Sequence, residues 1–365
     1  MRSVDGYSVA LLDTLGDRET MVHVESAEDF CRDILPAVSR TFAVGIRLLP
    51  GDLRATVGVA YLLCRVADTI EDAPELAADQ KAALLDELAE CFDDASRVAE
   101  FVTRAAIVPG DAAHRRLLHN TGLVFESYAR LTERSRTHVR HWVREMITGM
   151  RKFILAYPNG IRIQSLDEYK EYCYYAAGTV GYLLTDLWHE HAPSIGRRRY
   201  EILRARSRAF AEALQTVNIL KDVARDAEHE NAIFIPEQLL REVGSTHAMI
   251  LSADRVEQNR AALGQLVQLA WRDLDQATAY LLDIPRRAPS IRLFCALPLL
   301  FAHATLRDLT RTPGALARRE VVKISRAEVK AITLLSRLLV YSNGLLGWLV
   351  ARTRAKPVRF PLVEL

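Results

Sequence analysis

The stretch "YLLCRVADTIEDAP", residues 61–74, joins an apolar run directly to three carboxylates, Asp68, Glu71 and Asp72. Asp68 and Asp72 are four residues apart, so on a helix their side chains project from one face on successive turns. One interpretation is a solvated helix end, and the other is that the acids point inward. Carboxylates removed from water are costly unless they are paired or bind a metal. The second interpretation therefore requires a strongly positive partner.

A second pair of acids, Asp222 and Asp226 in "NILKDVARD", repeats this spacing far along the chain. One such pair is more often a solvated helix face than a ligand set, but two pairs that each end a mostly apolar helix favour ligands. Carboxylate oxygens suit Mg²⁺, which completes its octahedron with water and phosphate oxygens. Two facing pairs could hold Mg²⁺ with a diphosphate between them, an arrangement that ionises an allylic diphosphate beside an apolar cavity.

The whole chain has the composition and periodicity of a helical enzyme. Of its 365 residues, 50% are hydrophobic and 26% charged, as in an ordinary globular protein. Helical periodicity is nearly continuous, for example over 79–106, and strand-like alternation is almost absent. We predict an all-α protein with roughly ten to twelve helices around one core. The expected divisions are an N-terminal segment 1–29 that acts as a lid or is partly ordered, a single helical domain 30–350, and a basic tail 351–365.

Charge and cysteine content exclude several classes of protein. A net charge of +2 is too balanced to indicate a nucleic-acid partner. Five scattered cysteines without CxxC spacing are typical of reduced thiols in a cytoplasmic protein. The apolar segment 338–350 is too short to span a bilayer, so we expect no transmembrane helix. Basic residues beside Trp348 and Phe360 leave a peripheral membrane contact open, and the pattern does not indicate an oligomeric state.

Six segments together resemble the squalene/phytoene synthase family of isoprenoid head-to-head condensing enzymes, and its squalene synthase branch most closely. They are "SRTFAVGIRLLP" (39–50), "AYLLCRVADTIED" (60–72), "YCYYAAGTVGYLLTDLW" (172–188), "QTVNILKDVARD" (215–226), "FCALP" (294–298) and "VVKISRAEV" (321–329). The resemblance implies an isoprenoid synthase fold with a central apolar cavity. It also implies a prenyltransferase that condenses two farnesyl diphosphates through presqualene diphosphate, and then reduces the product to squalene with NADPH.

The resemblance assigns roles to residues at the family's motif positions. Mg²⁺ and diphosphate ligands are expected at Asp68, Glu71, Asp72, Asp222 and Asp226. Phosphate contacts are expected from Arg40 and Arg65, with the amides of Gln215 and Asn218 as polar contacts nearby. Tyr61 and Tyr172 take positions implicated in positioning or proton handling during the first condensation.

Further positions concern the cavity wall and the reductive step. Phe42 and Phe294 are expected to line the cavity, where aromatic faces can stabilise a cation. Gly178 and Gly181 could leave room beside a prenyl chain, although close helix packing would explain them equally well. Lys323 and Arg326 match the basic segment that the squalene branch uses with NADPH. Because no GxGxxG follows a strand, NADPH would have to bind at the synthase pocket itself.

Three departures from the family pattern cluster around the second acidic motif. Lys221 stands where arginine is usual, so the charge remains but the bidentate fork is lost. Arg225 stands where an acid is usual, and could pair with Asp222 or reach a phosphate. Glu230 and Asn231 stand where a Gly-Arg dipeptide is typical. These changes leave open an enzyme that ends at presqualene diphosphate or at a dehydrosqualene, phytoene-like, hydroxylated, cyclised or prenylated product, and also a non-catalytic binding protein.

Overall fold

The structure of the protein is a computed structural model that describes residues 26–312 and 322–359, except for the side chains of Arg40 and Thr41. Most of the predicted N-terminal segment 1–29 and the end of the predicted tail lie outside the described residues. Within the described residues, helices run from Ala27 to Ala355, so residues 29 and 350 both lie inside helices. The predicted division of the chain stays a prediction.

The described part of the chain is all-α, as predicted, and its only β pairing is an isolated bridge between Arg162 and Ile233. Its sixteen α-helices are α1 (Ala27–Val38), α2 (Arg40–Arg47), α3 (Gly51–Glu71), α4 (Ala78–Glu90), α5 (Val98–Ala105), α6 (Ala112–His119), α7 (Thr121–Ala129), α8 (Glu133–Ala156), α9 (Leu166–Cys173), α10 (Thr179–His191), α11 (Arg197–His229), α12 (Glu237–Glu242), α13 (Val256–Asp283), α14 (Pro289–Arg311), α15 (Arg326–Leu339) and α16 (Asn343–Ala355). A π-helical turn, Tyr174–Gly178, joins α9 to α10.

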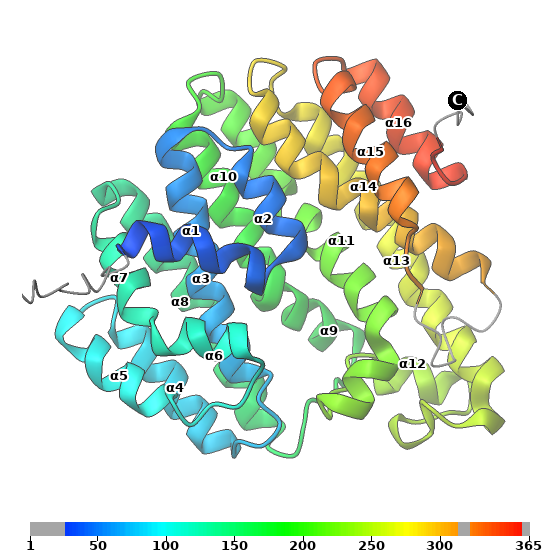
Figure 1. The fold of residues 1–365 in the computed structure, drawn as a ribbon. Coiled ribbons are helices and arrows are strands. Elements are labelled where there is room, and N and C mark those ends of the chain that lie inside the picture. Colours follow the sequence, from blue (N-terminus) through cyan, green and yellow to red (C-terminus); the bar gives the residue numbers. More distant parts are fainter. Residues whose placement is uncertain (1–25, 313–321, 360–365) are drawn as a thin grey trace, which may run out of the picture.

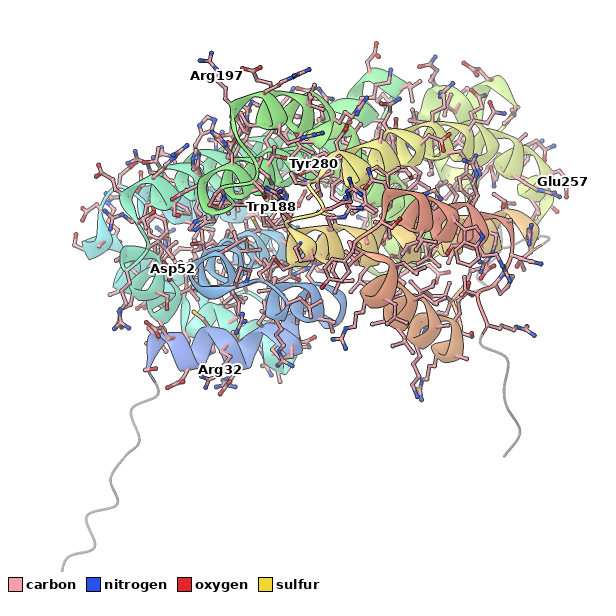
Figure 2. All side chains as sticks on the ribbon, turned by 90° about the horizontal axis from the view of Figure 1, so that it is seen from above. Arg32, Asp52, Trp188, Arg197, Glu257 and Tyr280 are labelled. Atoms are coloured by element: carbon pink, nitrogen blue, oxygen red, sulfur yellow. The ribbon has the colours of Figure 1, made fainter. Side chains whose placement is uncertain are left out.

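The helices form one bundle in which α3, α8, α10 and α11 occupy the centre (Figure 1). Helices α1, α2 and α4–α7 cover one side of this centre, and α12–α16 cover the other. Figure 2 shows Trp188 and Tyr280 in the interior, where both side chains are almost completely buried, while Arg32 and Arg197 point outward. Helix α3 is buried along most of its length, in keeping with its place in the middle of the bundle.

The prediction of ten to twelve helices was too low. Pro–Gly pairs such as Pro50–Gly51 and Pro109–Gly110 are the breaks that the sequence shows most clearly, whereas several helix boundaries lie at polar residues that satisfy free backbone groups. Ser39 separates α1 from α2 and accepts a hydrogen bond from the Phe42 N–H, and Ser342 caps α16 in the same way. The predicted amphipathic run 79–106 is likewise divided into α4 and α5 by a turn, after which Asp94 caps a short 3₁₀ segment.

Helix α14 is the one helix in the described residues that is long and apolar enough to cross a membrane by length and composition. Sequence analysis did not anticipate it. Because 72% of its apolar window is buried inside the protein, and because it carries the buried side chains of Arg292 and Arg307, α14 has the surroundings of a core helix.

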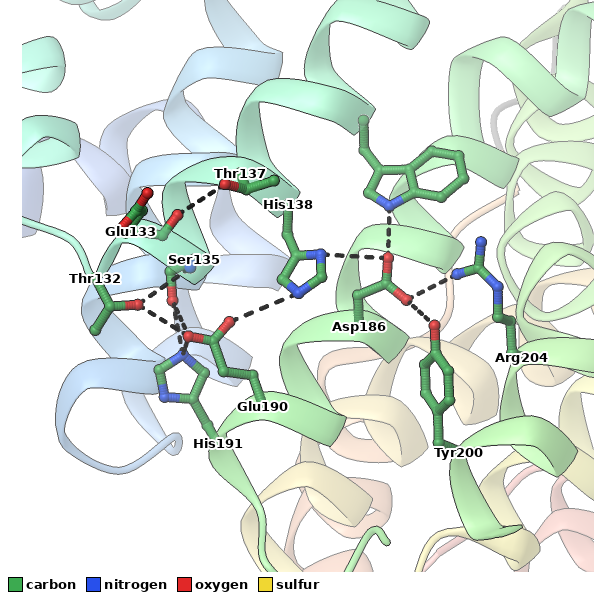
Figure 3. Close-up of polar contacts among 11 residues, drawn as sticks. Thr132, Glu133, Ser135, Thr137, His138, Asp186, Glu190, His191, Tyr200 and Arg204 are labelled. Carbon is green, nitrogen blue, oxygen red and sulfur yellow. Dashed lines mark hydrogen bonds and ion pairs between the residues drawn. The ribbon is translucent and has the colours of Figure 1, made fainter. Parts of the chain in front are cut away.

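A buried polar network connects three of the central helices, α8, α10 and α11 (Figure 3). Asp186 on α10 accepts hydrogen bonds from Trp142 Nε1 on α8, and from Tyr200 Oη and Arg204 Nη1 on α11, each at 2.7 Å. One turn later, Glu190 accepts hydrogen bonds from two hydroxyls at the start of α8. These charge-assisted bonds hold the three helices in one register.

We predict that Asp186→Ala lowers the free energy of unfolding by about 3 kcal/mol, because it leaves three buried or half-buried donors without their acceptor. Urea denaturation measures this change. Asp167→Ala is the control, because the Asp167 side chain is 97% exposed and its loss should leave stability unchanged. A loss below about 1 kcal/mol for Asp186→Ala would mean that the network does not hold the helices together.

Candidate functional site

An apolar cavity of about 210 Å³ lies at the centre of the bundle, between α3, α10, α11 and α14. The π-helical turn contributes Ala176 and Ala177 to its wall, a placement common for π segments at functional sites. Phe42 and Phe294 both line it, with ring centroids 6.5 Å apart. The described residues therefore form a central apolar cavity with Phe42 and Phe294 at its wall, and the role of these rings toward a cation stays a prediction.

The same cavity has one polar wall, formed by Tyr61, Arg65 and Asp68 on α3 and by Gln215 and Asn218 on α11. Arg65 Nη2 donates to Tyr61 Oη at 3.0 Å, and Arg65 Nη1 lies 3.4 Å from Asp68 Oδ2. These three side chains follow one face of α3, as their spacing predicted.

Arg65 retains an unmet hydrogen-bonding capacity at this wall. Its Nε is buried, and no partner for it occurs among the described residues. Burial lowers the pKa of Arg65, but Asp68 and Tyr61 outweigh that effect and keep the pKa above its usual value. A permanently charged guanidinium with a free donor at a cavity wall suits an anionic ligand.

A second, polar pocket of about 290 Å³ adjoins the end of α3. Glu71 and Asp72 line it, together with Lys81 of α4 and with Glu230 and Asn231, which follow α11. The first acidic motif is thus divided, because Asp68 faces the apolar cavity while Glu71 and Asp72 face the polar pocket. The described part of the chain offers no hydrogen-bond partner to the buried Oε1 of Glu71.

The second motif lies on the last turns of α11. Asp226 is 8% exposed. Asp222 forms an ion pair with the neighbouring Lys221, with Nζ and Oδ2 2.5 Å apart. Arg225 pairs with Glu230 at 2.7 Å rather than with Asp222. Two of the family departures therefore compensate each other, since the basic residue within the motif meets the acidic residue that follows it.

The two motifs lie within electrostatic reach of each other. The pKa of Asp72 is raised to about 7, first by burial and then by the charges of Asp68 and Glu230. Burial, followed by Glu230 and Asp222, raises the pKa of Asp226 to about 8, and Asp72 at the end of α3 also contributes. Burial raises the pKa of Asp68 as well. The ends of α3 and α11 therefore concentrate negative charge that their basic neighbours do not fully balance.

This arrangement fits Mg²⁺ that arrives with a diphosphate. In the described residues, no group of three or more His, Cys, Asp or Glu side chains is placed to hold a metal by itself. Mg²⁺ typically takes only one or two carboxylates and completes its shell with water and phosphate oxygens. The unpartnered Oε1 of Glu71 and the mutual repulsion of Asp72 and Asp226 are consistent with such a cation.

Tyr172 on α9 lies close to the first motif. It is 6% exposed and stacks on Phe234, which lines the polar pocket, with ring centroids 4.7 Å apart. Burial raises its pKa well above the usual value, and the charges of Glu71 and Asp72 add to this effect. The phenol therefore stays protonated beside the acids.

Residues 35–328 match the family model described as squalene/phytoene synthase. The chain belongs to the squalene/phytoene synthase family. It is 29% identical to the squalene synthase of Schizosaccharomyces pombe over 309 residues, which are 83% of this chain and 64% of that protein. It is 32% identical to squalene synthase BSS of Botryococcus braunii, over 76% of this chain and 57% of that protein.

This family member thus spans somewhat less than two thirds of the length of these relatives. Among solved structures, a complex of TcSQS with a ligand has a TM-score of 0.78 and 25% sequence identity. That match covers 93% of this chain and 94% of the other. The fold is therefore that of the squalene synthase-type isoprenoid synthases.

The contacts of the two family glycines favour close helix packing over a place beside the prenyl chain. Neither Gly178 nor Gly181 is among the cavity's lining residues. A Cβ at Gly181 would lie 2.3 Å from the Ser207 carbonyl oxygen, and one at Gly178 would lie 3.2 Å from Glu212 Oε1. Both glycines allow α10 and the turn before it to approach α11 closely, which is the alternative that the sequence left open.

Two residues predicted from the family pattern, Lys323 and Arg326, lie away from both cavities, and the position of a third, Arg40, stays a prediction. The Arg40 side chain lies outside the described residues. Lys323 and Arg326 are exposed and line neither cavity, and residues 313–321 just before them are not described. The NADPH role of this segment therefore stays a prediction.

Sequence reasoning missed Lys81 and underestimated Glu230. Lys81 Nζ donates to the Glu71 carbonyl oxygen at 2.7 Å, and burial lowers its pKa. Lys81 lies nine residues after Asp72, on the next helix, and the sequence does not show that its side chain reaches back to the acids. Glu230 was noted only as part of the pair Glu230–Asn231 that replaces a Gly-Arg dipeptide, whereas it adds a carboxylate whose charge raises the pKa of Asp72 and Asp226.

The raised pKa of Asp226 gives a pH prediction with a definite sign. An ionised Asp226 destabilises the folded state, so its cost begins near the unfolded pKa of about 4 and grows until the pH passes about 8. Asp226→Asn should therefore gain stability over the wild type as pH rises, by up to about 1.4 kcal/mol per unit, with a plateau above pH 8.

Urea denaturation of metal-free protein across this pH range measures the difference. Asp167→Asn, at an exposed position on α9, should show no pH-dependent difference from the wild type. A difference for Asp226→Asn that stays constant or shrinks as pH rises would contradict the assignment.

Proposed function

We propose that this protein is an Mg²⁺-dependent prenyltransferase that condenses two farnesyl diphosphates head to head into presqualene diphosphate, with NADPH-dependent reduction to squalene as the ending. The observation that carries this proposal is the electrostatic contact of two acidic helix ends beside an apolar cavity. Membership of the squalene/phytoene synthase family supports the same chemistry.

Different residues of the chain would bind the metal and the diphosphates. The acids of α3 and α11, namely Asp68, Glu71, Asp72, Asp222 and Asp226, would hold Mg²⁺. When bound, Mg²⁺ would neutralise the leaving diphosphate and so favour its departure from the allylic carbon. Arg65, with its free Nε, would bind a phosphate oxygen at the cavity wall. Lys221 and Arg225 are the further cations for the second diphosphate.

The apolar cavity would receive the prenyl chain and the allylic cation that ionisation leaves. Phe42 and Phe294 line this space, and aromatic rings can stabilise a cation. Gln215 and Asn218, which belong to the same polar wall as Arg65, would fix the polar end of the substrate from α11. The double bond of the second substrate attacks the cation, and ring closure to the cyclopropane releases one proton.

Tyr61 is the proposed residue for positioning or proton handling near the reacting carbons. Its hydroxyl is oriented by Arg65 at 3.0 Å and donates to the Val38 carbonyl oxygen at 3.4 Å. Tyr172 is the proposed second phenol, held protonated beside Glu71 and Asp72. These two tyrosines lie on different helices, α3 and α9, so they would act on different sides of the bound diphosphate.

The central cavity is small for two prenyl chains, so we expect it to enlarge when the substrates bind. The central cavity of about 210 Å³ is smaller than the usual range of about 300–1,000 Å³ for ligand pockets. A neighbouring cavity of about 430 Å³ lies between α1, α2, α3 and α7, and Ile46 lines both.

The ending of the reaction is tested by incubating the purified protein with Mg²⁺ and farnesyl diphosphate, with and without NADPH, and identifying products by mass. Squalene that forms only with NADPH is the expected result. The same product with and without NADPH would remove the reductive step and leave presqualene diphosphate or one of the other endings.

In the same assay, Asp68→Asn and Asp222→Asn should each slow diphosphate release on the order of 100-fold or more, because each removes a ligand for the leaving group. Asp167→Asn on the exposed face of α9 is the matched control and should keep wild-type activity. No diphosphate release from the wild type at any Mg²⁺ concentration would overturn the proposal in favour of a non-catalytic binding protein.

A further inference from the structure

The hairpin of α15 and α16 exposes an apolar surface that is not packed against the core. Nine large hydrophobic side chains are exposed in the described residues, and five of them lie in this hairpin. We call these five the hairpin tip: Leu334, Leu338, Tyr341, Leu345 and Trp348, with exposed fractions of 49%, 64%, 62%, 50% and 54%.

The tip is held in a fixed position by buried contacts on the other faces of both helices. Ile332 and Leu346 face the core and are fully buried. Arg292 of α14, also fully buried, donates to the Val340 carbonyl oxygen at 2.7 Å and to Asn343 Oδ1 at 2.8 Å. The turn of the hairpin is therefore anchored, and the exposure of the tip belongs to the folded state.

Charge on the hairpin has a single sign. Residues 322–359 contain eight Lys and Arg and one acid, Glu328. Glu328 is 3% exposed and bound to Arg307 at 2.9 Å, so it offers no negative charge at the surface. The full chain, in contrast, is nearly balanced at +2.

The basic residues flank the tip rather than cover it. Lys330 precedes Leu334 by one turn on α15, and Arg352 follows Trp348 by one turn on α16. Arg337 lies between Leu334 and Leu338 in sequence and is exposed.

The loop between α13 and α14 adds Arg286 and Arg287, both exposed. Figure 1 shows this loop and the α15–α16 turn at the same edge of the bundle, and Arg292 binds carbonyl oxygens of both, Ile284 and Val340.

Acidic groups near this edge are already paired. Asp275 of α13 binds Arg354 at 2.7 Å, and Asp283 at the end of α13 pairs with Arg199 and Arg206 of α11. The exposed edge is therefore a cluster of leucine and aromatic side chains with a cationic surround.

We propose that the hairpin tip inserts into the interface of a lipid bilayer that contains anionic lipids. Leucines at the tip would enter the acyl boundary, Trp348 and Tyr341 would lie at headgroup depth, and the flanking Lys and Arg would contact lipid phosphates. A second copy of the chain fits this surface less well, because it would bring two cationic surrounds together. This inference rests on the surface alone and is independent of the proposed reaction.

Co-sedimentation of the full chain with lipid vesicles tests the proposal. Binding is expected to vesicles of phosphatidylcholine with phosphatidylglycerol, and it should weaken with added salt and with phosphatidylcholine alone. The double variant Leu338→Ser/Trp348→Ser should bind at least about tenfold more weakly, because it removes apolar side chains from the tip. Lys330→Glu/Arg337→Glu should lose about tenfold or more through charge reversal.

Ile107→Ser is the matched control, because Ile107 is 58% exposed in the turn after α5, outside the hairpin. It should bind like the wild type, and equal thermal unfolding curves confirm that all variants are folded. Undiminished binding of Leu338→Ser/Trp348→Ser, or no binding of the wild type to anionic vesicles, would overturn the proposal. A concentration-dependent dimer that this variant abolishes, without vesicle binding, would assign the surface to a second copy instead.

Discussion

Repulsion between carboxylates at the ends of α3 and α11 is the constraint on which the site depends. Asp72 and Asp226 come from segments far apart in the chain, yet the charge of one raises the pKa of the other. Proteins place like charges together in a poorly hydrated space only where something else balances them. Here Arg65, Lys81, Lys221 and Arg225 balance part of the charge through near neighbours. The remainder suits a divalent cation bound together with an anionic ligand.

Hydrogen bonds and close packing between the helices oppose this repulsion. Asp186 fixes α8, α10 and α11 to one another through three short hydrogen bonds, away from the acids. Gly181 brings α10 so close to α11 that even a methyl group would collide with the Ser207 carbonyl. Helix α3 is buried along most of its length and so has little freedom to tilt. Rigid helices keep the acids beside the apolar cavity, where water cannot easily screen them.

The sequence was sufficient for features that local geometry determines. Helical periodicity predicted the all-α fold, and the four-residue spacing placed Asp68 and Asp72 one turn apart at the end of α3, where the Asp72 N–H donates to the Asp68 carbonyl oxygen at 2.8 Å. It was insufficient where the outcome depends on how distant surfaces pack. Lys81 reaches Glu71 only because α4 folds back on α3, and Gly181 serves helix packing because Ser207 lies opposite. The helix count failed because helix ends at Ser39 and Ser342 carry no Pro–Gly signal.

A double-mutant cycle on the binding of Mg²⁺ with inorganic pyrophosphate tests most directly whether the two helix ends act as one site. Calorimetric titration of the wild type, Asp72→Asn, Asp226→Asn and the double variant gives four binding free energies. If both carboxylates serve one bound metal–pyrophosphate unit, the loss in the double variant should differ from the sum of the single losses by about 1 kcal/mol or more. Losses that add to within about 0.5 kcal/mol would show two independent acids and would contradict the facing arrangement of α3 and α11.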